Sequence, residues 1–234
     1  MTTINVDEGF WQLFPDAKIG VLTVHGIDNH VKAEQTNHFQ ELLDASAEKS
    51  HQFLVEDVFR DNAVISQWRT AFTQFKKKKG ARSSIEALLK RIDQGNSLQS
   101  INPLVDIYNS VSLSFAMPCG GEDLNKIDGT MRLGIAEGGE SFRPLGEDED
   151  QPALNGEVIY YDQTGAICRC LNWRDAQRTM LTEATTDAIL VMEAINDEQQ
   201  QRLAPAMDQL KEYIGQMLGV TGDVVYLDQY TPKD

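Results

Sequence analysis

A capped helix is the feature that most constrains how this chain can fold. Asn102 followed by Pro103 is typical of a helix N-cap and first turn, and Asp106 lies where the positive end of the helix dipole favours a carboxylate. Apolar residues then recur at helical spacing, at Leu104, Ile107, Val111 and Phe115. We expect this stripe to be buried, which leaves Asp106, Asn109 and Ser110 elsewhere on the helix surface.

The end of this helix is marked as clearly as its start. Pro118 is expected to end the helix, and Gly120 and Gly121 follow it. Because glycine has no Cβ, these two residues allow the backbone to turn sharply or to approach a ligand closely. A helix and a turn are equally compatible with a purely structural role, since function depends on a site and not on local structure.

The rest of the chain indicates an alternating α and β organisation. Helices are expected at residues 31–50 and 62–76 and within 197–218, the last of them kinked or started by Pro205. Strands are expected at residues 18–24, 130–136, 141–145, 157–162, 166–171, 187–193 and 223–228, and a short strand or extended segment at 53–59. Ser83 and Glu86 have the spacing of a capping box, and the helix that they begin has an apolar face of Ile85, Leu88, Leu89 and Ile92.

Composition places the chain among ordinary globular proteins. With 234 residues, 41% of them hydrophobic and 24% charged, it fits one domain over residues 1–234 with decorations at both ends. No apolar run approaches the roughly 18 residues that would cross a membrane, and the first ten residues lack the pattern of a secretory signal. We therefore expect a cytoplasmic protein with no membrane partner.

The acidic charge balance argues at first against a nucleic-acid partner. A formal net charge of -15 repels a polyanion at long range. Residues 69–91 are an exception, because eight Lys or Arg minus one acid, Glu86, leave a local charge of +7. This stretch is interpreted either as solvated surface or as a contact for RNA phosphates. The candidate RNA-binding residues are Lys76, Lys77, Lys78, Lys79 and Arg82.

Motifs for metal, redox or nucleotide chemistry are not evident. Three cysteines without a repeated CxxC pair suggest neither a disulfide framework nor a zinc site, and Cys168 and Cys170 alternate in an expected strand as small buried residues. The histidines at 25, 30 and 38 match no metal-binding spacing. The sequence contains no GxSxG, Walker or GxGxxG signature, so we expect no metal and no cofactor.

Residues 172–185 are dense in polar side chains and have two interpretations. One is a polar loop whose arginines pair with Asp175 and Glu183, and the other is a small pocket lined by hydrogen-bond donors. Paired carboxylates for acid–base chemistry are not needed to explain the acidic residues nearby, because capping explains Asp106 and a turn explains Asp123 beside Glu122.

Taken together, these segments resemble the B3/B4 domain of the phenylalanyl-tRNA synthetase beta subunit. The matching residues of the helix and its following loop are Val105, Asp106, Asn109, Pro118 and Asp123. The likeness continues through residues 126–129, 132–136 and 139–142. Residues 172–175 and the threonines at 179, 182 and 185 resemble the freestanding bacterial form of the domain. The resemblance is strongest over residues 75–195, and it implies an α+β fold with helices packed on a β-sandwich-like core.

The resemblance also implies a function, the hydrolysis of mischarged aminoacyl-tRNA in trans. Because the ester is already activated, such a site needs to position a water and to stabilise an oxyanion. The resemblance assigns catalysis to Asn109, Gly120, Gly121 and Thr179. It assigns substrate binding to Tyr108, Asn172, Trp173, Arg174 and Arg178, with tRNA or aminoacyl-tRNA as the partner.

Departures from the synthetase pattern keep other functions open. Gly120 stands where the family has a histidine, and Tyr108 stands where it has a threonine. Nothing resembles the synthetase catalytic core, so ligase activity is not expected. One alternative is a non-catalytic module that binds an amino acid or a tRNA end, and another is a small-molecule enzyme that reuses the pocket.

Overall fold

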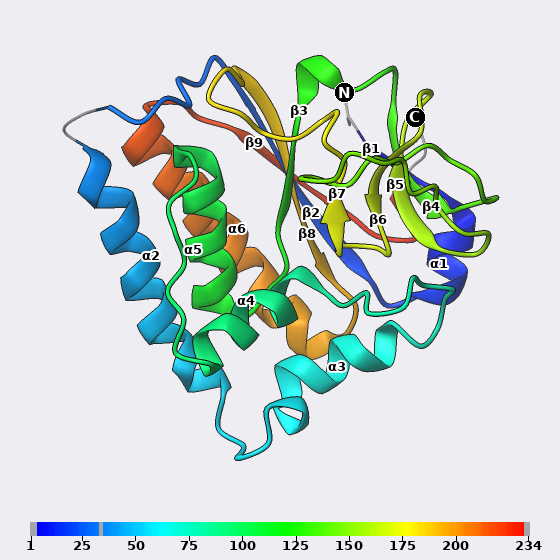
Figure 1. Cartoon of the computed structure of the whole chain (residues 1–234), viewed down its shortest axis with the longest axis horizontal. Helices are drawn as coiled ribbons and strands as arrows, with labels where there is room; N and C mark the ends of the chain where they lie inside the picture. The colour runs from blue at the N-terminus through cyan, green and yellow to red at the C-terminus, as the bar shows by residue number, and fades with distance from the viewer. Residues whose placement is uncertain (1–3, 33–34, 232–234) are drawn as a thin grey trace.

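Two β-sheets and a layer of helices make up the fold (Figure 1). The computed structural model describes residues 4–32 and 35–231. In the order of neighbouring strands, the first sheet contains β1 (Ile4–Val6), β4 (Met131–Ile135), β5 (Val158–Tyr161), β6 (Ala166–Arg169) and β7 (Arg174–Asp175). The second contains β3 (Gly120–Asp123), β8 (Asp187–Ala194), β2 (Lys18–His25) and β9 (Asp223–Leu227). Strand β1 runs parallel to β4, and the other paired strands are antiparallel.

The helices cover both the outer face of the second sheet and one end of the sandwich. They are α1 (Glu8–Leu13), α2 (Thr36–Ser50), α3 (Ala63–Ala71), α4 (Ser84–Asp93), α5 (Pro103–Phe115) and α6 (Asp197–Leu218). Figure 1 shows α2, α5 and α6 gathered on one side of the second sheet, with the first sheet on its other side.

The strands of the second sheet separate two hydrophobic cores. Alternate residues of a strand face opposite sides, so Val21 joins the core between the two sheets while Leu22 joins the core under α2, α5 and α6. The same alternation in β8 directs Val191 inward between the sheets and Leu190 toward the helices. Helices packed on a sandwich-like pair of sheets are the α+β fold predicted from the sequence, and that prediction is confirmed.

Helix α5 begins as predicted but is more deeply enclosed. The Asn102 side chain accepts a hydrogen bond from the Val105 amide at 3.1 Å, which confirms the N-cap. The surface position predicted for Asp106 and Ser110 is wrong, because both side chains are fully buried. Helices α2 and α6 and the second sheet enclose α5, and Asp106 accepts hydrogen bonds from Ser100 Oγ at 2.5 Å and from the Ile101 amide at 2.9 Å.

The two glycines after α5 do not form the predicted turn. Ala116 makes the reversal instead, with a left-handed φ of 48°, and Gly120 and Gly121 lie in β3 opposite Val191 and Leu190. The missing Cβ is used for close packing at Gly121, where a Cβ would lie 2.7 Å from Leu190 Cδ2.

The predicted capping box at the start of α4 does not form. Ser83 occupies the N-cap position, but its side-chain hydroxyl has no hydrogen-bond partner among the described residues. Glu86 is buried and accepts from the Arg69 guanidinium at 2.7 Å, so an ion pair with α3 draws this carboxylate away from the helix end.

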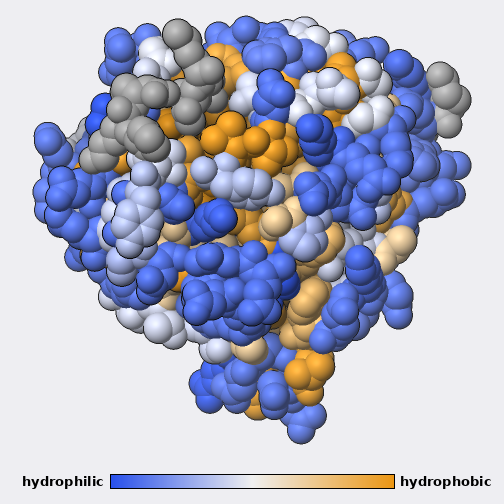
Figure 2. Space-filling view, turned by 180° about the vertical axis from the view of Figure 1, so that it is seen from behind, coloured by the Kyte–Doolittle hydropathy of each residue, from blue (hydrophilic) through white to orange (hydrophobic). Residues whose placement is uncertain are grey.

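Other element boundaries differ for local reasons. Residues 141–145 are not a strand, because Pro144 lacks an N–H and forms only an isolated bridge with Ala176. Residues 53–59 join two short 3-10 turns, at His51–Phe53 and Phe59–Asp61, and do not enter a sheet. This segment forms the protruding lower end of the molecule, which carries exposed hydrophobic atoms in the view from behind (Figure 2).

Both long helices also differ in detail from their predictions. The helix expected over residues 31–50 begins at Thr36, and residues 33 and 34 of that range lie outside the described residues. The last helix starts at Asp197, where the Asn196 side chain caps the Gln199 amide at 2.9 Å, and Pro205 lies inside it without starting it. The pair β1 and α1 was not predicted.

Candidate functional site

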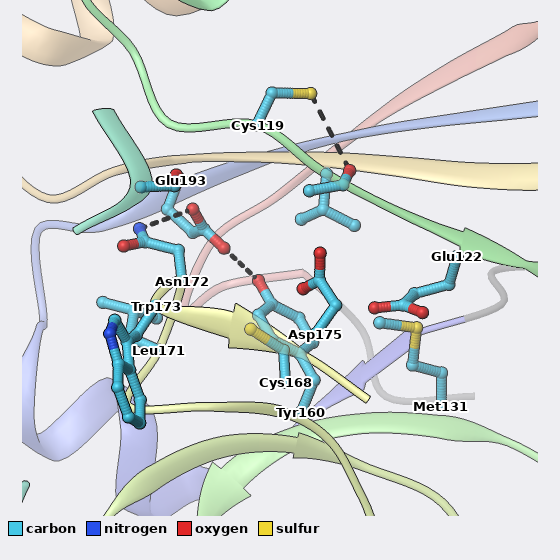
Figure 3. A pocket seen from close by; sticks show the side chains of 13 residues that line it. Cys119, Glu122, Met131, Tyr160, Cys168, Leu171, Asn172, Trp173, Asp175 and Glu193 are labelled. Atoms are coloured by element: carbon cyan, nitrogen blue, oxygen red, sulfur yellow. Dashed lines mark hydrogen bonds between the residues drawn. The ribbon is translucent and has the colours of Figure 1, made fainter. Parts of the chain in front are cut away.

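A small cavity opens between the two sheets, next to the edge strands β3 and β7. It has a volume of about 50 Å³. Glu122 and Gly120 reach it from β3, Glu193 from the end of β8 and Asp175 from β7 (Figure 3). Cys119, just before β3, and Asn172 and Trp173, just before β7, complete the side that opens toward α4.

The period of two along each strand explains why polar side chains meet here. In the second sheet Gly120 pairs with Val191. Glu193 lies two residues further along β8, so the side chains of Val191 and Glu193 both face the first sheet. In the first sheet Tyr160 pairs with Cys168, and Cys168 pairs with Asp175, which sets these three side chains in one row across β5, β6 and β7. Two facing rows therefore build the cavity walls.

Glu193 is the best-anchored carboxyl group of the site. It is almost fully buried, and it accepts hydrogen bonds from the Tyr160 hydroxyl at 2.6 Å and from Asn172 Nδ2 at 3.0 Å (Figure 3). Burial raises the pKa of Glu193 to about 7, although both hydrogen bonds act in the opposite direction. This carboxyl group therefore titrates close to neutral pH.

Glu122 and Asp175 form an acidic pair with perturbed ionisation. Burial, reinforced by the negative charge of Asp175, raises the pKa of Glu122 well above its ordinary value. Burial also raises the pKa of Asp175 to about 6, and a hydrogen bond from the Cys168 thiol works against that rise. Glu122 Oε2 has no hydrogen-bond partner within the described part of the chain.

The two thiols at the cavity are not activated nucleophiles. Burial raises the pKa of Cys119 and that of Cys168 well above the ordinary value, so both sulfurs stay protonated near neutral pH. Cys119 donates a weak hydrogen bond to the Gly120 carbonyl at 3.7 Å. The chemistry available at this site is thus that of carboxyl groups, an amide and hydroxyl groups.

Trp173 connects the cavity with the basic run. The Lys78 ammonium lies 5.9 Å from the centroid of the Trp173 ring, and the Arg174 guanidinium carbon lies 5.3 Å from it. Lys78 also donates a hydrogen bond to Gln151. The backbone joins the same regions, because the Ser84 amide at the start of α4 donates to the Asn172 carbonyl at 3.0 Å.

The structure brings part of the sequence-predicted site together. Gly120, Asn172 and Trp173 line the cavity. Gly121 and Tyr108 lie just behind its β3 wall, since a Cβ on Gly121 would be 3.5 Å from Tyr108 Cε1.

Other predicted site residues lie further from the cavity. Thr179 is buried, and its carbonyl accepts from the Asp123 amide at 2.8 Å, which ties it to β3. Asn109 is half-buried on α5 and is not among the cavity-lining residues. Arg174 faces outward to Glu147 at 3.5 Å, and Arg178 forms an ion pair with Asp162 at 2.8 Å.

The predicted RNA-binding residues form an exposed surface beside α3 and α4. Lys76, Lys77, Lys79 and Arg82 are exposed, and Lys78 is half-buried. Lys77 and Arg82 line a shallow hollow together with Arg69, and the Lys77 ammonium lies 5.9 Å from the centroid of the Phe72 ring. Positive side chains thus extend from this hollow to the cavity rim at Trp173.

Several residues of the cavity were missed or set aside in the sequence analysis. Glu193 and Tyr160 were not considered, and Glu122 was considered only as the neighbour of Asp123, which a turn was expected to explain. One signal was available, because Glu193 is the only charged residue in the otherwise apolar segment 188–194 of an expected buried strand. A buried charge in a strand indicates a site or a network, since burial without partners is costly.

No three His, Cys, Asp or Glu side chains within residues 4–32 and 35–231 are grouped so that they could hold a metal ion. Among the same residues, no helix is long and apolar enough to cross a membrane.

Comparison with known proteins identifies the family. The model of the B3/4 domain matches residues 67–213, which is well over half of the 234 residues. The chain belongs to the B3/4 domain family. All of the cavity-lining side chains described above lie within this B3/4 match.

A solved structure is similar to this B3/4 protein over almost its whole length. It is an N-terminal fragment of the phenylalanyl-tRNA synthetase beta-subunit from Pyrococcus horikoshii, with 12% identity and a TM-score of 0.45. The alignment covers 98% of this chain and 55% of the fragment, so the chain spans about half the length of that structure. A comparison with curated proteins gives no match.

Proposed function

We propose that this B3/4 protein binds the aminoacylated end of a tRNA and hydrolyses the ester of a mischarged tRNA in trans. The observation that carries the proposal is the direct contact between a buried polar cavity and a run of positive side chains, made at Trp173. An ester substrate on a polyanion needs both features, one for the acyl group and one for the phosphates.

The cavity chemistry suits ester hydrolysis without a covalent nucleophile. An aminoacyl ester is an activated acyl group, so a positioned water and a proton acceptor suffice. Carboxyl groups whose pKa is about 6 at Asp175 and about 7 at Glu193 are matched to proton transfer near neutral pH. We propose that Gly120 and Gly121 contribute to catalysis, one of them as an oxyanion donor through the backbone amide that faces away from β8, with Asn109 and Thr179 also contributing.

The remaining predicted residues are proposed to hold the substrate. Tyr108, Asn172 and Trp173 would bound the acyl group, and Arg174 and Arg178 would lie toward the tRNA. Residues 76–79 and Arg82 would contact phosphates, because their local positive charge opposes the overall charge of -15. Cytoplasmic tRNA is the partner that this proposal requires.

A deacylation panel tests the proposal. Purified protein is incubated with a broad set of correctly and incorrectly charged tRNAs, and the release of amino acid is compared with that in buffer. We expect faster release from at least one mischarged tRNA, with no requirement for ATP and no formation of aminoacyl-adenylate. A dependence on ATP would refute the hydrolase, and no release from any tRNA would favour the non-catalytic binding module.

A further inference from the structure

The size of the cavity limits what can enter it. Its volume is about 50 Å³. A protein cavity of about 150 Å³ is large enough to admit a benzene molecule. An aromatic ring therefore does not fit between these two sheets, whereas a methyl or hydroxymethyl group does.

Gly120 provides part of this space. It pairs with Val191 in antiparallel register, so a side chain at position 120 would face the first sheet, as the Val191 side chain does. A Cβ on Gly120 would meet a single atom within 4 Å, Asp175 Oδ1 at 4.0 Å. Since Gly120 and Asp175 both line the cavity, the volume that a side chain would fill here belongs to the cavity.

The next residue shows that this open space is specific to Gly120. A Cβ on Gly121 would lie 2.7 Å from Leu190 Cδ2 and 2.8 Å from Leu181 Cδ1. The absence of a side chain at Gly121 is thus needed for close packing, whereas the absence of one at Gly120 leaves room for another molecule.

Met131 closes the inner end of the cavity. It is the first residue of β4, and it is buried. Figure 3 shows Met131 at one end of the cavity and Trp173 at the other. Because Trp173 is half-buried at the rim, a group that enters beside it would advance toward Met131.

The walls of the cavity are held by inner strands. Met131 lies on β4 between β1 and β5, and Val191 lies on β8 between β3 and β2. Both side chains belong to the core between the sheets, and the hydrogen bond to Glu193 at 2.6 Å holds the Tyr160 side chain. Because protein interiors are close-packed, a group larger than the cavity can enter only by displacing core side chains, which costs free energy.

We propose that this cavity takes the side chain of a small amino acid, such as alanine or serine, from an aminoacyl ester, and that Gly120 and Met131 set the size limit. The proposal rests on the proposed function, because that function supplies the aminoacyl group. Aromatic amino acids are excluded by volume. Gly120 and Met131 are specificity-determining residues here: one leaves space for the amino-acid side chain, and the other ends that space.

Three adenosine analogues test the size limit. Each carries an aminoacyl group in amide linkage on a 3′-amino-3′-deoxyribose, so none can be hydrolysed as an ester, and the glycyl, alanyl and phenylalanyl compounds differ only in the amino-acid side chain. Calorimetry should give at least about tenfold tighter binding of the alanyl than of the phenylalanyl compound. Equal affinities, tighter binding of the phenylalanyl compound, or no binding of any of them would overturn the size limit.

Gly120→Ala makes the cavity smaller without disturbing the fold. Gly120 lies in an extended strand, and the added methyl group meets no atom closer than 4.0 Å, so the melting temperature should stay unchanged. The alanyl compound should bind about tenfold more weakly than to the natural protein, because the added methyl group occupies the place of its side chain. Binding of the glycyl compound should change much less. An unchanged ratio of alanyl to glycyl affinity would refute the role of Gly120.

Met131→Ala makes the cavity larger at its inner end. The ratio of alanyl to phenylalanyl affinity should fall at least about fivefold, because the truncated side chain leaves its volume to the ligand. Met207→Ala is the matched control, since Met207 is also fully buried but lies on α6, in the core on the other face of the second sheet. It should lower the melting temperature and keep the natural ratio. The same ratio in all three proteins would refute the role of Met131.

The deacylation panel distinguishes this proposal from the proposed function. Hydrolysis of an aminoacyl-tRNA combined with equal binding of the alanyl and phenylalanyl compounds would keep the hydrolase and remove the size limit. A clear alanyl preference without hydrolysis of any tRNA would keep the size limit in a binding module.

Discussion

Replacing Glu193 by glutamine should make the protein more stable at high pH and almost unchanged at low pH. Glutamine cannot ionise but can keep the local hydrogen bonds. Its amide oxygen can accept from the Tyr160 hydroxyl, and its amide nitrogen can donate to Asn172 Oδ1, which lacks a partner, once the Asn172 amide rotates. The substitution therefore removes the titration of one group with little change of shape.

The magnitude follows from the displaced ionisation of this group. Folding raises the pKa of Glu193 from 4.5 to about 7 because the carboxyl group is buried. Its stabilising contribution is fully present below pH 4.5, where the acid is neutral in both states, and it is lost as the pH rises through 7. At about 1.4 kcal/mol per pKa unit, the loss amounts to about 3 kcal/mol of the free energy of unfolding.

Urea unfolding followed by circular dichroism measures this effect in both proteins between pH 5 and 8. The variant should gain stability relative to the natural protein steadily across that range and reach a plateau above it. Glu41→Gln, on the exposed face of α2, serves as the control and should show no such trend. A constant difference between Glu193→Gln and the natural protein at every pH would refute the reasoning.

Three further predictions concern other parts of the molecule. Neutralising Lys76–Lys79 together should weaken tRNA binding and flatten its salt dependence in filter-binding assays while the melting temperature stays nearly constant; an unchanged salt slope would assign the run to solvated surface. Asn109→Ala should cost less than about 1 kcal/mol of stability yet reduce deacylation, whereas the fully buried Val111→Ala should cost about 1 to 3 kcal/mol and keep the rate; melts and rates on both variants decide. Gly121→Ala should destabilise by about 1 to 3 kcal/mol, because its Cβ would lie 2.7 and 2.8 Å from two leucine side chains; a melting temperature equal to that of the natural protein would contradict this packing.

Most of the secondary structure could be predicted because its signals are local. The Asn102 cap, the apolar run of β2 and the helix from Asp197 each depend on residues a few positions apart. Predictions failed where a distant partner decided the outcome. Glu86 has the spacing for a capping box, but Arg69 on another helix binds it, and no local pattern contains that information.

The candidate site was predictable only in part for the same reason. Gly120, Asn172 and Trp173 could be proposed because they lie in segments that resemble a family. Glu193 and Tyr160 reach the cavity from strands of different sheets, 33 positions apart in the chain. Only the packing of the two sheets brings them within hydrogen-bond distance, so their pairing and the raised pKa of Glu193 are tertiary properties.

The position of Trp173 gives this protein a built-in optical probe. Of its three tryptophans, Trp11 on α1 and Trp68 on α3 are buried in the hydrophobic core that contains Val21 and Val191, whereas Trp173 is half-buried at the cavity rim with two cations over its ring. Indole emission depends on neighbouring charge and on solvent. Occupation of the cavity or of the adjacent basic surface should therefore change the emission of one tryptophan while the other two remain a constant internal reference, without any attached label.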